Sequence, residues 1–180
     1  MKIQKYGAVR KLNWFLGGTG NPTATTKPYR IILVDDHALF RRQIKRIIEE
    51  APNLEVVGEA DDGFEALDLI KEIGPDLVIL DISMPKCGGI EASRKIKSLY
   101  PDLKVLILTI NRDEPYMQHA MAVGVDGYLL KEVAMDELIE AILTLMEGKT
   151  YFSLVRSKYE RSEPIQRTTA ARISLAKEGI

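Results

Sequence analysis

Residues 31–36 read Ile31-Ile32-Leu33-Val34-Asp35-Asp36, a fully apolar run that ends in two carboxylates. A short run that is apolar at consecutive positions and rich in branched side chains is typical of a strand buried on both faces of a sheet. Apolar residues then recur at helical spacing from Leu39 to Ile48, with basic residues between them, and Ala51-Pro52 ends that helix. The first unit is therefore a buried strand followed by an amphipathic helix.

The same unit recurs four more times before residue 150. The strands are expected at residues 31–34, 54–57, 77–80, 103–108 and 127–130. A helix is expected after each strand, ended by glycine or proline. Strands that alternate with helices form a parallel sheet covered on both faces, with right-handed crossovers. The predicted fold class is α/β, a doubly wound five-stranded parallel sheet.

Charge divides the chain into three parts. The net charge is −1 over 180 residues, but residues 1–30 contain six Lys/Arg and no acid, whereas residues 31–150 carry a net charge of −10. The expected organisation is a basic flexible extension over 1–29, one folded domain over 30–150, and a basic tail or start of a linker over 151–180. We expect that tail to contain no complete output domain. An acidic body lacks the clustered cations that nucleic acids require, so we expect DNA contact only through an output domain not visible in this chain.

Composition excludes several classes of protein. No apolar run approaches the ~20 residues that cross a bilayer, and residues 12–18 make a poor secretory signal. The single cysteine, Cys87, leaves no internal disulfide and no cysteine-rich zinc site. We therefore expect a reduced, cytoplasmic protein with no membrane partner. One short helix is expected within residues 168–178.

Polar residues follow the apolar strands at the point where each strand ends. Parallel strands end at one edge of a sheet, where ligands of such folds bind, so we expect these side chains to converge. They are Asp35, Asp36, Asp81, Thr109 and Lys131. Three carboxylates without cysteine or histidine suit a hard divalent cation such as Mg²⁺, and a lysine beside them can pair with a carboxylate or a phosphoryl group.

This combination of residues suits phosphoryl transfer to a carboxylate. The metal and Lys131 would neutralise charge on the phosphoryl oxygens, and Thr109 would offer a hydroxyl hydrogen bond. Carboxylates form acyl phosphates in known enzymes, and Asp81 follows the strand expected between the other two contributors. The pattern therefore predicts Asp81 as the acceptor.

Over residues 29–150 the sequence resembles a response-regulator receiver domain of two-component signalling, which has a flavodoxin-like (βα)5 fold. The resemblance rests on Asp35-Asp36, on Asp81-Ile82-Ser83-Met84-Pro85, on Thr109, and on Tyr128-Leu129-Leu130-Lys131. Each element alone is weak, but the ordered set is specific. Residues 105–109, 127–132 and 148–153 further resemble receivers of LuxR/NarL-type transcription regulators.

The resemblance implies a signalling function for these residues. Asp81 would be phosphorylated by a sensor histidine kinase, and Thr109 and Tyr128 would act as a conformational switch. Mg²⁺ would be bound by Asp36, Asp81 and the Ser83 backbone carbonyl, with Asp35 assisting through water. The output would be homodimerisation or control of transcription, and the chain would assist its own phosphorylation and dephosphorylation without being a turnover enzyme.

Two departures from the family pattern and two other functions remain open at this stage. Ile110 stands where many receivers carry a small residue, and Glu132 stands where many carry proline. A Mg²⁺-dependent phosphatase that works through an aspartyl phosphate is one alternative, although Ser83 occupies the place of its usual second aspartate. A non-phosphorylated interaction scaffold is the other. His37 is expected to be a surface residue at the start of the first helix and not a catalyst, and Cys87 is expected to be a bystander.

Overall fold

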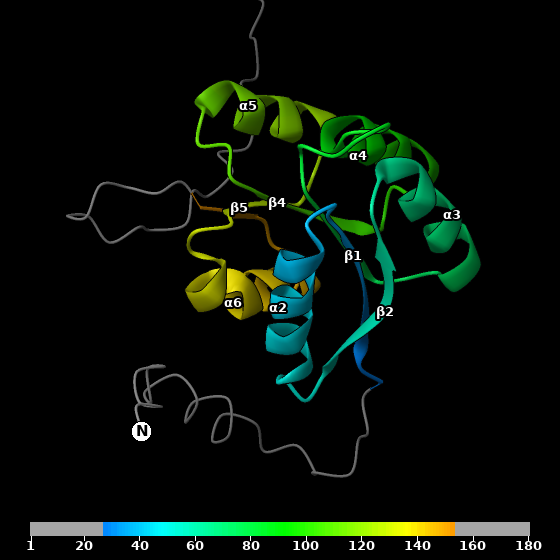
Figure 1. The fold of residues 1–180 in the computed structure, drawn as a ribbon, viewed down its shortest axis with the longest axis vertical. Coiled ribbons are helices and arrows are strands. Elements are labelled where there is room, and N and C mark those ends of the chain that lie inside the picture. The colour runs from blue at the N-terminus through cyan, green and yellow to red at the C-terminus, as the bar shows by residue number, and fades with distance from the viewer. Residues whose placement is uncertain (1–26, 154–180) are drawn as a thin grey trace, which may run out of the picture.

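A computed structural model describes residues 27–153 of the chain (Figure 1). The expected extension over 1–29, the tail over 151–180 and the helix within 168–178 therefore lie wholly or largely outside the described residues. Between residues 27 and 153, strands and helices alternate as the apolar pattern predicts. The strands are β1 Tyr29–Val34, β2 Leu54–Ala60, β3 Leu77–Leu80, β4 Lys104–Thr109, β5 Gly127–Leu130 and β6 Tyr151–Phe152.

All strands of the described sheet are parallel, in the order β2-β1-β3-β4-β5-β6. The chain first adds β2 on one side of β1 and then adds β3 to β6 on the other. The predicted doubly wound parallel sheet is confirmed. The reversal of strand order places a switch point between β1 and β3, where two crossovers leave in opposite directions. Ligands of such folds bind at the carboxyl ends of the strands near this point.

The sheet has one strand more than predicted. In β6, Tyr151 N donates to the carbonyl of Asp126, and Ser153 N donates to the carbonyl of Tyr128. Two residues are too few to form an apolar run, so the sequence pattern could not reveal this strand. The sheet therefore continues past residue 150, the end expected for the folded domain.

Helices cover both faces of the sheet (Figure 1). Below the sheet in that view lie α2 (Ala38–Glu49) and α6 (Ala134–Met146), and above it lie α3 (Gly63–Ile73), α4 (Gly89–Leu99) and α5 (Glu114–Val123). Alternate strand residues feed two separate cores. In β1, Ile31 and Leu33 pack toward α2 and α6, whereas Ile32 and Val34 pack toward the other helices. Burial on both faces explains why the strands are apolar at every position.

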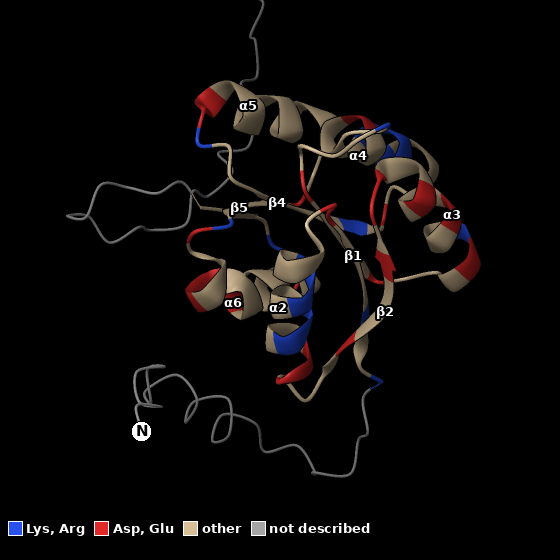
Figure 2. Ribbon diagram, viewed as in Figure 1, with Lys and Arg blue, Asp and Glu red and all other residues tan. Residues whose placement is uncertain are grey.

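Among the described residues, no helix combines the length and apolar character needed to cross a membrane. Figure 2 shows basic residues along α2 and acidic residues near the end of β1. The edge of the sheet formed by the carboxyl ends of the strands is called the carboxyl edge below, and the opposite edge is called the amino edge.

Candidate metal centre at the carboxyl edge of the sheet

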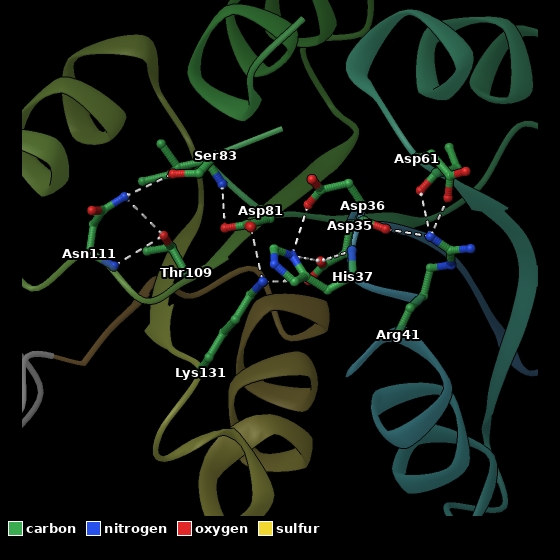
Figure 3. Close-up of polar contacts among 12 residues, drawn as sticks. Asp35, Asp36, His37, Arg41, Asp61, Asp81, Ser83, Thr109, Asn111 and Lys131 are labelled. Atoms are coloured by element: carbon green, nitrogen blue, oxygen red, sulfur yellow. Dashed lines mark hydrogen bonds and ion pairs between the residues drawn. The ribbon is translucent and has the colours of Figure 1, made fainter. Parts of the chain in front are cut away.

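The five polar residues predicted at the strand ends lie together at the carboxyl edge (Figure 3). Thr109 is the last residue of β4, three of the others directly follow β1, β3 and β5, and Asp36 lies one position further along the chain. They come from four strands and are Asp35, Asp36, Asp81, Thr109 and Lys131. Of these, Asp35, Asp81 and Thr109 are buried. The shared direction of the strands therefore gathers residues up to 96 positions apart.

Lys131 joins two of the carboxylates. Its Nζ lies 2.6 Å from Asp35 Oδ2 and 2.9 Å from Asp81 Oδ2, and its side chain is only 10% exposed. The Phe40 ring of α2 lies 4.7 Å from the same ammonium, which adds a cation–π contact. Since screening by solvent is weak at such a site, Lys131 stabilises a pair of carboxylates that would otherwise repel each other.

The backbone around Asp81 is held on two sides. Asp81 N donates to the carbonyl of Val34 in β1, and Asp81 Oδ1 accepts from Ile82 N at 2.7 Å. The helix α4 begins against this segment: a Cβ on Gly89 would lie 2.0 Å from the Asp81 carbonyl oxygen. Only glycine permits this close approach of two backbones. The carboxylate of Asp81 is thus fixed on a rigid strand end.

We call Asp35, Asp36 and Asp81 the acidic site. Ligand atoms of these three residues and of His37 lie within 4.8 Å of one another. One lysine offsets three carboxylates, so the site retains excess negative charge. Carboxylate oxygens close together are the donors that Mg²⁺ prefers, and the residues present fit such an ion.

His37 lies closer to the acidic site than the sequence suggested. Its Nδ1 is 2.9 Å from Asp36 Oδ1 and 3.3 Å from Asp35 Oδ1, while its side chain is 67% exposed. Its backbone N donates to Asp35 Oδ1 at 2.9 Å. Sequence reasoning placed His37 at the surface, which is right, but missed the contacts that its place directly after two acids made possible.

Asn111 connects the hydroxyl of Thr109 to two neighbouring segments. Its backbone N donates to Thr109 Oγ1 at 3.2 Å, and its Nδ2 lies 3.4 Å from both Thr109 Oγ1 and Ser83 Oγ. Its carbonyl accepts from the Tyr128 hydroxyl at 2.8 Å. Asn111 lies in a loop with no apolar period, so no sequence signal identified it.

Tyr128 is fully buried in this structure. Burial raises the pKa of its phenol to about 12, with smaller contributions from the charges of Asp113 and Asp81. The Tyr128 ring is therefore turned inward in this structure. Asn111, which accepts its hydroxyl hydrogen, is the residue through which this position contacts Thr109.

Comparisons with known proteins agree with this geometry. Residues 31–143 match the model of the response regulator receiver domain family. The chain belongs to this family. The resemblance on which the sequence analysis relied is thereby confirmed, and the domain described here is a receiver of two-component signalling.

Relatives and solved structures of this receiver include transcription regulators. DegU of Brevibacillus brevis, a transcriptional regulatory protein, is 43% identical over 131 residues, which are 73% of this chain and 56% of DegU. The response regulator GacA of Pseudomonas aeruginosa is 38% identical over 124 residues, 69% of this chain and 58% of GacA. The chain thus spans little more than half the length of these relatives.

Two solved structures resemble the receiver over most of its described length. A LuxR-family two-component response regulator from Aurantimonas sp. SI85-9A1 matches with a TM-score of 0.67 at 37% identity, covering 69% of this chain and 89% of that one. The non-phosphorylated receiver domain of the stress response regulator RcsB from Escherichia coli matches with a TM-score of 0.67 at 26% identity, covering 71% and 99%. The LuxR/NarL-type resemblance is confirmed.

Proposed function

We propose that this receiver is a phosphorylation-dependent switch in which Asp81 accepts a phosphoryl group from a sensor histidine kinase. The observation that carries the proposal is the position of Lys131, whose Nζ lies within 3 Å of both Asp35 and Asp81 in an otherwise acidic and largely buried site. A lysine held there can bond an arriving phosphoryl oxygen without leaving Asp81. The negative charge that Lys131 does not neutralise would be balanced by one divalent cation.

Asp36, Asp81 and the backbone carbonyl of Ser83 would hold Mg²⁺, with Asp35 assisting through water. When bound, the ion would supply positive charge to the phosphoryl oxygens, as metals do in phosphoryl transfer generally. Support comes from the donor set, since the carboxylate oxygens of the acidic site lie within 4.8 Å of one another. Ser83 is exposed at the rim of the site, within reach of Asn111.

The transfer itself needs little covalent chemistry from the protein. A carboxylate oxygen of Asp81 forms a bond to phosphorus while the phosphorus–nitrogen bond of a phosphohistidine breaks, and the imidazole leaves with the electron pair of that bond. Lys131 neutralises charge on the equatorial oxygens, and the Thr109 hydroxyl donates to one of them. The other ring nitrogen of the phosphohistidine carries a proton, so the imidazole leaves as a neutral group and no general acid is needed from this chain. One phosphoryl group is retained per chain.

The switch would work through Thr109, Asn111 and Tyr128. Thr109 Oγ1 accepts from Asn111 N, and its hydroxyl hydrogen would donate to a phosphoryl oxygen on Asp81, which would draw Thr109 toward the phosphoryl group. Movement of Thr109 would then pull on the loop whose carbonyl holds the Tyr128 hydroxyl, and the face formed by α5, β5 and α6 would change. Phosphorylation shifts an equilibrium only by its differential contacts with the two states.

The output would be homodimerisation or control of transcription in the cytoplasm. DNA would be contacted only by an output domain outside the described residues, and the receiver unit would extend through Phe152. The transcriptional output is supported by DegU, a transcriptional regulatory protein among the relatives, and the extent of the unit is supported by the pairing of β6 with β5.

Phosphorylation in vitro tests the proposal. The protein is incubated with acetyl phosphate, with and without Mg²⁺, and examined by intact-protein mass spectrometry. We expect one added phosphoryl group that requires Mg²⁺ and is released by hydroxylamine, as acyl phosphates are. Asp81→Asn should abolish it, whereas Asp102→Asn, which removes an exposed carboxylate at the amino edge, should not.

An unchanged mass under all conditions would reject phosphorylation and revive the scaffold hypothesis. Repeated turnover of acetyl phosphate or small phosphoesters at rates typical of enzymes would instead favour the phosphatase hypothesis. A phosphoryl group that remains in Asp81→Asn would reject Asp81 as the acceptor.

A further inference from the structure

Arg41 of α2 contacts the acidic site from behind. Its Nη1 donates to the carbonyl oxygen of Asp35, reaches the carbonyl oxygen of Ala60 at 3.5 Å, and pairs with Asp61 Oδ1 at 2.5 Å (Figure 3). Its Nε donates to Glu59 Oε2 at 3.0 Å. The side chain is only 14% exposed, so these bonds are largely protected from water.

The acceptors of Arg41 belong to the carboxyl ends of two neighbouring strands. Asp35 follows β1, and Ala60 is the last residue of β2, where Asp35 N donates to the Ala60 carbonyl. Arg41 therefore ties the exit of β1 to the exit of β2 through a planar group with fixed donor directions. The backbone held in this way is the one that carries Asp35 and, one residue later, Asp36.

The charge of Arg41 and its geometry have opposite effects on a cation at the acidic site. A nearby positive charge repels a divalent cation, so removing the charge alone should tighten binding. Loss of the guanidinium group, with its several hydrogen bonds, would free the backbone of Asp35 and weaken binding of the cation. Burial lowers the pKa of Arg41, but the hydrogen bonds to Glu59 and Asp61 raise it by more. The net shift of the pKa is upward, so the guanidinium group stays charged.

We propose that Arg41 is a positioning residue that holds Asp35 and Asp36 in the arrangement that binds Mg²⁺. This inference rests on the proposed function, because it concerns the same ion. Groups that orient metal ligands without touching the metal typically change metal affinity by about 10- to 100-fold when they are removed. The predicted weakening is thus opposite in sign to the electrostatic effect.

Mg²⁺ titration of the full chain by isothermal calorimetry tests the proposal. The variants are Arg41→Gln, which removes both the guanidinium group and its charge, and Arg41→Lys, which keeps the positive charge but loses the planar set of donors. The matched control is Arg42→Gln, since Arg42 is exposed on the next position of α2 and carries the same charge. Each protein is measured at low salt and at about 1 M salt, where the Debye length falls to about 3 Å.

We expect both Arg41 variants to weaken Mg²⁺ binding about 10-fold or more at both salt concentrations. Arg42→Gln should change it less than about threefold, and only at low salt. Thermal melts and circular dichroism confirm that each variant is folded. Wild-type affinity in Arg41→Lys, or a weakening that disappears at high salt, would overturn the positioning role.

If both Arg41 variants fail to fold, Asp61→Asn decides, because the Asp61 carboxylate is 66% exposed and tolerates change. If Asp61→Asn weakens Mg²⁺ binding at high salt, the proposal is supported. If its Mg²⁺ affinity at high salt equals that of the wild type, the proposal is overturned. If the wild-type chain itself binds no Mg²⁺, the proposed function fails and this inference fails with it. If the wild type binds Mg²⁺ and Arg41→Lys does too, only the inference fails.

Discussion

Carboxylates and lysines meet at both edges of the sheet, but in opposite proportions. At the amino edge, Asp126 pairs with Lys97 Nζ at 2.5 Å and with Lys104 Nζ at 3.1 Å, and its Oδ2 also accepts from Val105 N. At the carboxyl edge, Lys131 pairs with Asp35 and Asp81, and the third carboxylate of the acidic site, Asp36, contacts His37. One acid has two cations in the first case, and three acids have one cation in the second.

This difference separates a cluster whose charges are balanced from one that retains excess negative charge. The Asp126 cluster is satisfied by its own partners, with side chains 12–28% exposed, so it requires nothing from solvent. The acidic site keeps negative charge that its own residues do not neutralise, and it is therefore prepared for a cation and an anionic group together. The ratio of carboxylates to lysines, more than the presence of charged residues, distinguishes the acidic site from the Asp126 cluster.

The largest effect is expected from breaking the amino-edge cluster. Asp126→Asn leaves Lys97 and Lys104 without a counter-charge and should lower the free energy of unfolding by about 2–4 kcal/mol. Urea unfolding measures this change, and Mg²⁺ affinity of the folded variant should stay within a few-fold of wild type. A loss below about 0.5 kcal/mol would place this cluster with ordinary surface ion pairs.

A smaller effect is expected from filling the carboxyl edge. Mg²⁺ at ten times its dissociation constant should raise the free energy of unfolding by about 1.4 kcal/mol, because the ion binds only the folded state. A chelator should reverse the gain. Asp126→Asn should show the same increment and Asp81→Asn should show none, so equal increments in both variants would place the ion elsewhere.

The smallest effect, and the sharpest contrast, comes from repeating the same substitution at the other edge. Without Mg²⁺ and at low salt, Asp36→Asn should raise the free energy of unfolding by about 0.2–1 kcal/mol, because it relieves repulsion within the acidic site. The gain should shrink as salt is added. A loss comparable to that of Asp126→Asn would show that the two edges do not differ in kind.

The strands and the acidic site could be predicted because both follow from local pattern. An apolar run such as Leu77–Leu80 can be buried only between two layers, and the residue after it must lie at the edge of the sheet. Five residues predicted at strand ends do lie together there. The strand β6 was missed because it depends on pairing with β5, a long-range contact that two residues cannot encode by periodicity.

The contacts of Asn111 and Arg41 were also beyond prediction. Asn111 reaches Ser83 across 28 positions, and Arg41 reaches Asp61 across 20. Both residues lie on segments where many polar side chains are exposed, so their type says nothing about their partners.

The amino-acid order alone determined the alternation of strands and helices, the shared direction of the strands, and the identity of the acids, hydroxyl and lysine at their ends. Only the tertiary structure decided which of these groups are in contact. Lys131 pairs with both Asp35 and Asp81, and His37 contacts Asp36. The Arg41 guanidinium donates to the carbonyl oxygen of Asp35. The reason is that burial is governed by short-range apolar pattern, whereas a polar contact depends on the angle and distance at which separate elements pack.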